Sequence, residues 1–318
     1  MTTPVFLTID TELMWRHHVA GLPVAEQVAR SIEPAGVGVG YQLRVLAAHG
    51  LRATFFVDPM PARTYGIDVV KAMVAPILAA GQAVQLHLHP NWAGAVAGDG
   101  GAAHARFELI DYSLEQQRDL IAEAAALLMA AGVPQPVAFR SGSYAANDDT
   151  LVALAKLGFA YDSSHNGSEH PWPSAISLPV RQIAPVAHHG VIECPVTLIE
   201  DVPGKLRHFQ ICALSVAEMR AALDHATRAN HAAVTIVSHG FELAARTGTR
   251  ANRVHVRRFE ALCAMLAARA AAMPTICYAD AAGLRLGQGD VPLGPNVLRT
   301  RLRQAEQLWS NIVEERAA

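Results

Sequence analysis

Long hydrophobic segments and a strong excess of charge are both missing from this chain. No apolar run approaches ~20 residues without a charge or a turn former, so we expect no membrane-spanning helix. The start of the chain lacks the basic and long apolar regions of a signal peptide, and we therefore expect a cytoplasmic protein. The formal net charge of −2 gives no electrostatic reason to expect nucleic acid or an anionic membrane as a partner.

Cysteine is also scarce. The four cysteines among 318 residues lie far apart within apolar stretches, so we expect buried free thiols rather than a disulfide framework. Hydrophobic residues make up 51% of the chain and charged residues 17%, which is typical of a globular protein rather than a disordered one. The length suits one large α/β domain or two smaller ones, and the lack of a repeat or a linker favours one.

Apolar runs typical of strands alternate with alanine- and leucine-rich helical segments along most of the chain. This alternation predicts a parallel β/α architecture, because parallel strands are joined by long, usually helical crossovers. We expect strands at residues 5–10, 51–57, 83–87, 136–140, 159–162, 191–196, 233–239 and 275–278. We expect helices at residues 41–49, 69–80, 113–132, 148–157, 215–230, 256–272 and 296–315.

The alternating pattern stops near residue 287. We therefore divide the chain into a main unit, residues 1–287, and a C-terminal loop and helix, residues 288–318. The helix expected at residues 296–315 has apolar positions that suit packing on the main unit or on a second subunit: Leu298, Leu302, Leu308 and Ile312. We also expect an irregular segment at residues 165–189 and a loop at residues 93–105 that is long enough to be functional.

Two pairs of potential metal ligands close two of the expected strands. Asp10 and Glu12 follow the first strand, and His87 and His89 follow the third. Residues two apart on a strand point to the same face, with Cα atoms roughly 6.5–7 Å apart. Two carboxylates and two imidazoles on strand ends suit a divalent cation, and zinc is the first choice.

Other expected strands also end in ionisable residues, namely Arg140, Asp162 and His239. In barrels of parallel strands the active site lies at the carboxyl ends of the strands and draws residues from several of them. Charged groups near a core are costly unless they are paired or bind a metal. We therefore expect one functional site at this end of the sheet.

With these motifs the chain resembles the NodB-homology polysaccharide deacetylases, which form carbohydrate esterase family 4. The resemblance covers roughly residues 4–285 and rests on short segments in the family's order, at residues 7–12, 50–57, 86–92, 139–144, 161–164 and 236–239. It implies a distorted (β/α) barrel of parallel strands, here with a C-terminal helical appendage. It also implies a divalent metal, with Zn²⁺ first and Co²⁺, Ni²⁺ or Mn²⁺ as alternatives, and a small-molecule or glycan substrate.

The resemblance further implies a role for each residue of the site. Asp10 would act as general base, and Arg140 would hold its carboxylate by bidentate hydrogen bonding. His239 would protonate the leaving amine, with Asp162 supporting its imidazole. The implied metal ligands are Glu12, His87 and His89. The oxyanion would lie on a backbone N–H near Tyr144. Separately from the resemblance, Trp92 and Phe241 are candidate substrate contacts, because the apolar faces of sugars stack on aromatic rings.

Two motifs depart from the family pattern. The acids are separated by Thr11 where the common motif has adjacent aspartates, and the second histidine comes two residues after His87 instead of four. The position four residues on is Asn91, which stays an alternative ligand to His89. Plainer interpretations also stay open, because each of these residues occurs as a strand-end turn residue or an ordinary ion-pair partner.

Together these patterns predict a metal-dependent hydrolase of an amide bond that acts on an N-acetylated sugar or a polysaccharide precursor. One alternative is hydrolysis of a non-sugar formamide or cyclic amide, which the same residues would serve. Another is a catalytically silent barrel that binds a glycan or a partner protein.

Overall fold

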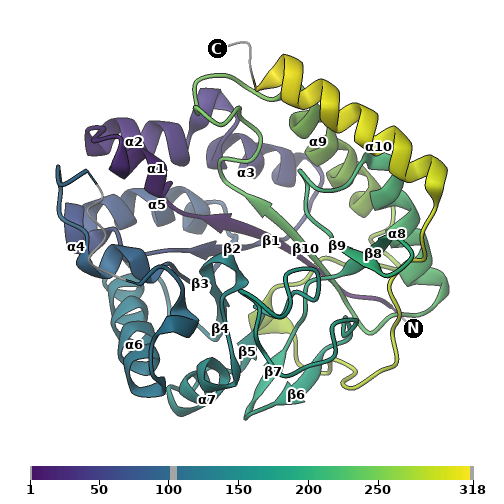
Figure 1. Cartoon of the computed structure of the whole chain (residues 1–318), viewed down its shortest axis with the longest axis horizontal. Coiled ribbons are helices and arrows are strands. Elements are labelled where there is room, and N and C mark those ends of the chain that lie inside the picture. The colour runs from purple at the N-terminus through teal and green to yellow at the C-terminus, as the bar shows by residue number, and fades with distance from the viewer. Residues whose placement is uncertain (1, 101–105, 316–318) are drawn as a thin grey trace.

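A curled sheet of eight strands forms the centre of the computed structural model, which describes residues 2–100 and 106–315 (Figure 1). The strand order is β10-β1-β2-β3-β4-β5-β7-β6, and every neighbouring pair except β6–β7 is parallel. The strands are β1 (Val5–Thr11), β2 (Thr54–Val57), β3 (Ala83–Leu88), β4 (Ala138–Ser141), β5 (Tyr161–Asp162), β6 (Val186–His188), β7 (Val191–Glu193) and β10 (Val234–His239). The expected distorted (β/α) barrel is therefore confirmed, as a half-barrel with edges at β10 and β6.

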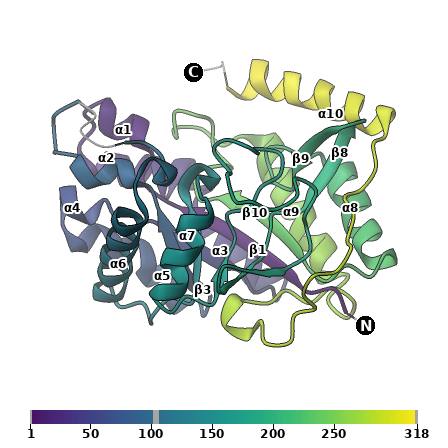
Figure 2. The ribbon, with the colours of Figure 1, turned by 60° about the horizontal axis from the view of Figure 1, so that its bottom comes forward.

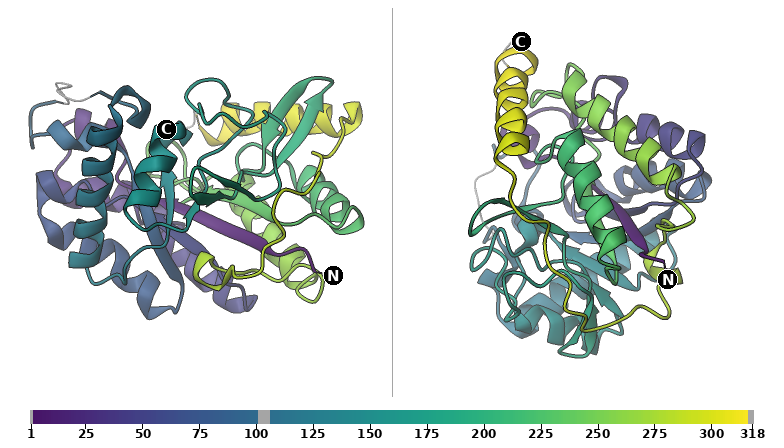
Figure 3. Two further views of the ribbon diagram at one scale, coloured as in Figure 1. Left: turned by 90° about the horizontal axis from the view of Figure 1, so that it is seen from below. Right: turned by 90° about the vertical axis from the view of Figure 1, so that its right-hand side faces the viewer.

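Helices cover the outside of this curled sheet, as Figure 1 and the two views of Figure 3 show. They are α1 (Trp15–Val19), α2 (Val24–Ser31), α3 (Val39–Ala48), α4 (Ala62–Tyr65), α5 (Ile67–Ala79), α6 (Leu114–Ala130), α7 (Asp148–Lys156), α8 (Val216–Arg228), α9 (Arg253–Ala267) and α10 (Val297–Trp309). Capping boxes at Ser113, Asn147 and Ser215 begin α6, α7 and α8, because each side chain accepts the backbone N–H three residues on.

The strands β1, β2 and β4 are buried along their whole length, as is typical of strands in a parallel sheet. All seven residues of β1 are buried. The register then aligns the strand ends: Asp10 lies beside His239 of β10, and His87 lies beside Arg140 of β4. Side chains far apart in the sequence are thus brought to one end of the sheet.

Some elements differ from the sequence expectations. The strand predicted at residues 275–278 is wrong, because only Thr275 bridges to Val5 and a 3-10 turn begins at Tyr278. The segment at residues 165–189, expected to be irregular, ends in β6, which pairs with β7 as a hairpin. A second hairpin, β8 (Leu198–Val202) with β9 (Lys205–His208), was not predicted, because polar residues interrupt its apolar pattern. The loop expected at residues 93–105 lies partly outside the described residues.

The C-terminal helix α10 lies along the outer edge of the molecule, beside β8 and α9 (Figure 2). The division of the chain at residue 287 stays a prediction. Within the described residues, no helix combines the length and the apolar character needed to cross a membrane.

Candidate functional site

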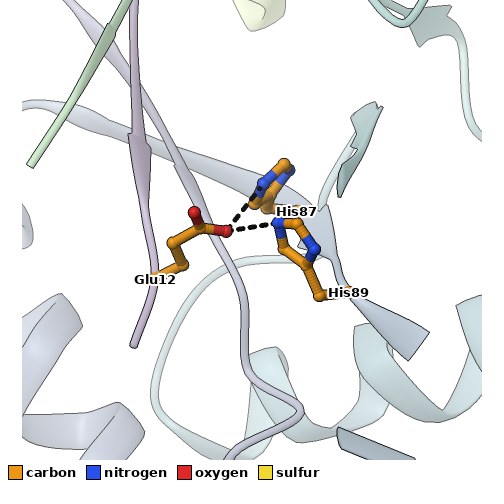
Figure 4. Close-up of side chains that lie close together, drawn as sticks. All are labelled: Glu12, His87 and His89. Atoms are coloured by element: carbon orange, nitrogen blue, oxygen red, sulfur yellow. Dashed lines mark ion pairs between the residues drawn. The ribbon is translucent and has the colours of Figure 1, made fainter. Parts of the chain in front are cut away.

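Glu12, His87 and His89 form a compact cluster at the carboxyl ends of β1 and β3 (Figure 4). The ligand atoms of the three side chains all lie within 4.8 Å of one another. His87 Nε2 lies 3.3 Å from Glu12 Oε2, and His89 Nε2 makes a closer ion pair with the same oxygen. The two pairs predicted from the sequence are Asp10 with Glu12 and His87 with His89. Within each pair, the spacing of two residues places both side chains on the same face of the sheet, because side chains alternate along a strand.

The donor set fits a divalent cation. His87 donates its Nδ1–H to the carbonyl oxygen of Arg140 at 2.8 Å, which leaves the Nε2 lone pair directed toward Glu12. Glu12 Oε2 is buried, and the groups that face it are the imidazoles of His87 and His89. A carboxylate oxygen and two imidazole nitrogens are ligands typical of zinc, and three protein ligands leave a coordination position open, as in catalytic sites.

The ionisation of these groups reflects their burial and their mutual attraction. Burial raises the pKa of Glu12, but the imidazoles of His89 and His87 outweigh it and hold that pKa well below its usual value. Burial alone would lower the pKa of His89, yet Glu12 raises it to about 9. Without a metal, therefore, a Glu12 carboxylate and a His89 imidazolium stabilise each other.

Asp58, which directly follows β2, is a further buried carboxylate near this cluster. Its Oδ1 accepts the N–H of Met60 at 3.0 Å, and its Oδ2 has no partner in the described structure. Burial raises its pKa to about 6, against the opposing influence of His89 and His87. Sequence reasoning missed this residue, although its position directly after the second expected strand was a usable signal.

Gly142 leaves the space that the His89 ring occupies. A Cβ atom added at residue 142 would lie 2.3 Å from Nδ1 and 2.4 Å from Cε1 of His89, far inside van der Waals contact. The two residues that follow, Ser143 and Tyr144, both have positive φ, at 54° and 58°. Such backbone conformations are uncommon for residues other than glycine and cost about 1–3 kcal/mol each. The turn after β4 therefore leaves room for the His89 imidazole, because residue 142 has no side chain.

We expect Gly142→Ala to weaken metal binding by about tenfold or more without unfolding the protein, because the new methyl group displaces the His89 ring. Titration with Zn²⁺ against a competing chelator measures the affinity, and circular dichroism checks the fold. Gly289→Ala is the matched control, since a Cβ there meets nothing within 4 Å. Equal zinc affinity in the two variants would contradict the placement of His89.

Asp10 and Arg140 form a fully buried ion pair beside the cluster. Arg140 Nη1 donates to Asp10 Oδ1 and to Thr8 Oγ1, each at 2.7 Å. Its Nε and Nη2 donate instead to the backbone oxygen and Oγ of Ser163, so the expected bidentate contact with Asp10 is a single hydrogen bond. The guanidinium also lies 4.5 Å above the ring of Phe56. Arg140 therefore fixes one oxygen of Asp10 and leaves the other free to act.

His239 faces Asp10 from the end of β10. Its Nε2 lies 3.9 Å from Asp10 Oδ2, and its Nδ1 lies 3.9 Å from Glu242 Oε2. Burial lowers the pKa of His239, but Glu242 and Asp10 together raise it to about 9. Glu242 is held in place by the backbone N–H groups of Cys212 and His239.

The carboxylate that supports His239 is thus Glu242, not the Asp162 expected from the sequence. Asp162 is buried, and its oxygens accept the N–H and Oγ–H of Ser164. It shares a buried environment with Glu193, and burial raises the pKa of both carboxyl groups. Nothing in the sequence singled out Glu242, which lies on the loop after the strand.

The three expected substrate contacts differ in their exposure. Tyr144 is partly buried, and its hydroxyl has no hydrogen-bond partner within the described chain. Phe241 packs against the His239 ring with 4.9 Å between centroids. Trp92 is only 1% exposed and packs against Trp15, so it offers a sugar almost no open face. Asn91, the alternative ligand to His89, lines the adjoining cavity.

A second cluster of metal-ligand type lies elsewhere, at Asp148, His188 and His189. Both oxygens of Asp148 already accept hydrogen bonds from Ser177, at 2.9 and 2.6 Å. The three side chains are also more exposed than Glu12 and His87, so water competes more strongly with a metal. The Glu12 cluster is therefore the stronger candidate.

Known proteins match this chain by structure and not by sequence. No protein-family model matches the sequence, and neither does any curated protein. The structure is similar to a provisionally named polysaccharide deacetylase from Mycobacterium smegmatis, with 19% identity, a TM-score of 0.54, and coverage of 96% of this chain and 91% of that one. It is also similar to a 4-alpha-glucanotransferase from Thermococcus litoralis, with 10% identity, a TM-score of 0.53, and coverage of 92% of this chain and 41% of that one.

A family 4 carbohydrate esterase from Streptomyces lividans also matches, with 14% identity, a TM-score of 0.42, and coverage of 92% of this chain and 98% of that one. The expected resemblance to the polysaccharide deacetylases is thus confirmed at the level of the fold. The first two similar structures share this fold, but their names state different activities. The activity of this chain must therefore be argued from its own site.

Proposed function

We propose that this protein is a metal-dependent hydrolase of an amide C–N bond and that its substrate is an N-acetylated sugar. The observation that carries the proposal is the Glu12–His87–His89 cluster with Asp10 and His239 beside it. The arrangement supplies the three functions that amide hydrolysis needs: a cation site, a base for water and an acid for the departing amine. A divalent cation held by this cluster would lower the pKa of water and polarise the amide carbonyl.

Asp10 is the candidate general base. Its Oδ1 is held by Arg140, while Oδ2 faces the space shared with His239. Because the carboxylate cannot rotate away from Arg140 without leaving a buried cation unpaired, its free oxygen stays positioned to take a proton from water.

His239 is the candidate general acid. Glu242 and Asp10 stabilise its imidazolium, so the ring carries the proton at neutral pH. The departing nitrogen of an amide is too basic to leave as an anion, and a positioned imidazolium supplies its proton. Asp10 thus takes a proton from the attacking water, and His239 gives a proton to the departing amine.

The direct test is release of free acetate from N-acetylated hexosamine derivatives by the zinc-loaded protein. Our proposal requires release that stops on chelation and returns when Zn²⁺ is restored. Release from formamides or cyclic amides instead of sugars would assign the same site to a different substrate. Release that survives chelation would remove the basis for the proposal.

We expect the pH profile of kcat/KM to fall as pH rises through about 9, where His239 loses the proton that it must donate. Removing the Glu242 charge destabilises the imidazolium, so Glu242→Gln moves this alkaline limb to lower pH by roughly one unit. Glu260→Gln is the control, because Glu260 pairs with Tyr41 on the surface. An unchanged limb in the Glu242 variant would exclude His239 as the acid.

A further inference from the structure

A small cavity of about 230 Å³ adjoins the candidate metal cluster. Glu12 and His89 form part of its wall, and Trp15 lies beside them. Arg16 and Arg246 complete the wall from α1 and from the loop after β10. Two guanidinium groups therefore face the space next to the site where we place the scissile amide.

Neither the Arg16 guanidinium nor that of Arg246 makes an ion pair within the described ranges 2–100 and 106–315, although the carboxylates of Glu315 and Glu12 lie near Arg16. Arg16 Nη2 contacts only the sulfur of Met14, and its buried Nε has no hydrogen-bond partner there. Burial and the nearby charge of Arg246 lower the pKa of Arg16 to about 10, and the carboxylates of Glu315 and Glu12 offset this only in part.

We propose that Arg16 and Arg246 bind an anionic group of the substrate, a phosphate or a carboxylate, beside the amide that is cleaved. The inference rests on the proposed function and narrows the substrate to an anionic N-acetylated sugar. Arginine pairs bind such groups because their fixed N–H forks match the oxygens, and a bound anion relieves their mutual repulsion.

Calorimetric titration of the zinc-loaded protein tests this subsite without requiring turnover. The probes are N-acetylglucosamine 1-phosphate, the uronic acid of N-acetylglucosamine and neutral N-acetylglucosamine. We expect at least one anionic probe to bind about tenfold more tightly than the neutral sugar, and the tighter of the two identifies the anion. We expect this preference to fall below about twofold in the Arg16→Met/Arg246→Met variant.

Arg44→Met is the matched control, since Arg44 stacks on Tyr41 at another surface. Equal affinities for charged and neutral sugars in the wild type would overturn the subsite, and so would a preference that survives loss of both arginines. Binding preference without acetate release would support the subsite and contradict the proposed function. Acetate release without the binding preference would support the proposed function and contradict the anion subsite.

The C-terminal helix α10 turns its polar face toward the protein and its apolar face toward solvent. Its inner face is polar, with Thr300 and Arg303 buried, and so is Ser310 at the start of the turn that follows the helix. Its outer face carries large apolar side chains that are 51–68% exposed: Val297, Leu298, Leu302, Leu308, Trp309 and Ile312. A helix on the surface of a monomer normally turns its apolar stripe toward the core.

Specific polar contacts hold the helix in this orientation. Arg303 donates to Asp201 at 2.6 Å and to Glu218 at 3.1 Å, and all three side chains are buried. Arg258, also buried, donates to Glu306 at 2.7 Å. Rotating the apolar face inward would leave these buried charges unpaired, at a cost of about 3–5 kcal/mol for each broken pair. The outer stripe is therefore a fixed feature of the surface.

The stripe has the spacing of a helix–helix seam. Leu298, Leu302, Ala305 and Trp309 follow one another along α10 at intervals of four and three residues, as the core positions of a heptad do, and Ile312 lies in the π-helical turn Ser310–Glu314 that continues the helix. The pattern is nearly symmetric about Ala305, so an antiparallel copy sets Leu298 against Ile312 and Leu302 against Trp309. A surface that complements itself about a two-fold axis fits an isologous dimer.

We infer that α10 pairs with α10 of a second copy of this chain, with the two-fold axis near Ala305. Six large apolar side chains on this one surface segment, each 51–68% exposed, offer the kind of apolar surface that lies at the centre of stable interfaces. The helices can approach closely at the axis because Ala305 is small.

Sedimentation equilibrium of the full chain tests the pairing. We expect a wild-type dimer at micromolar concentration and a monomer for Leu302→Glu/Trp309→Glu. Met129→Glu is the control, because Met129 is an exposed apolar residue on another helix, and we expect it to stay dimeric. A monomeric wild type, a dimeric double variant, or wild-type binding to anionic vesicles in place of self-association would overturn the inference.

Cysteine cross-linking keeps the test independent of the charged variants. Under mild oxidation we expect Ala305→Cys to form an intermolecular disulfide, since residue 305 meets its own copy at the axis. Leu298→Cys should not, because its antiparallel partner is residue 312. Cross-linking of both variants would show a parallel pair, and cross-linking of neither would show that the helices do not meet, so either result contradicts the antiparallel dimer.

Discussion

Asp10→Asn lowers kcat for amide hydrolysis by about 10³-fold in our account, within the range found for loss of a general base. The amide oxygen still accepts the hydrogen bond from Arg140, but it cannot take a proton from water. Metal binding should persist, because Glu12, His87 and His89 are intact. Steady-state kinetics and zinc titration of the same preparation measure the two effects separately.

This variant also leaves the buried Arg140 cation without its counter-charge, so we expect it to lose about 3–5 kcal/mol of stability. Asp201→Asn is the matched control, because it breaks another buried pair, with Arg303, outside the site. Because Arg303 keeps its second partner, Glu218, we expect a smaller loss of stability there, with kcat per folded molecule unchanged. Equal losses of kcat in the two variants would assign the effect of Asp10 to folding rather than to catalysis.

His87→Ala should weaken zinc binding by about 100-fold or more and abolish acetate release at stoichiometric zinc, because it removes a ligand whose tautomer the protein fixes. Loss of an outer contact alone typically costs 10–100-fold, so loss of the ligand should cost more.

His188→Ala distinguishes the two histidine clusters of the chain. It removes a member of the Asp148 group and should leave one equivalent of tightly bound zinc. If this variant lost the tight zinc while His87→Ala kept it, the cation would belong to the Asp148 group and the proposed active site would be wrong.

The sequence predicted the parts of the site that depend on strand geometry. Asp10, Glu12, His87 and His89 lie on predicted strand ends, where a period of two fixes the shared face. The register between parallel strands then brings Arg140 and His239 to the same end. These placements follow from hydrophobic patterning and from the rule that parallel strands share an active end.

The residues that the sequence did not reveal lie in loops and depend on tertiary packing. Glu242 lies on the loop after β10 and faces the His239 imidazole with its carboxylate. Gly142 lies in the turn after β4 and leaves space for the His89 ring. Arg16 and Arg246 meet only because α1 and the loop after β10 line the same cavity. No periodicity marks such residues, since loop conformation is set by the surrounding structure.

The orientation of α10 is a similar case. Its apolar residues were evident from the sequence, and packing on the main unit and packing on another subunit both stayed open. The buried partners of Arg303, Asp201 on β8 and Glu218 on α8, decide which face turns inward. Amphipathicity alone would have turned the opposite face to the core.

The central claim is that Glu12, His87 and His89 share one cation, with Asp10 and His239 beside it. An anomalous-difference map from crystals grown with zinc, recorded at the zinc absorption edge, tests this claim most directly. We expect one strong peak about 2 Å from Glu12 Oε2 and from Nε2 of both histidines. A peak at the Asp148 cluster alone, or no peak within coordination distance of Glu12, would contradict it.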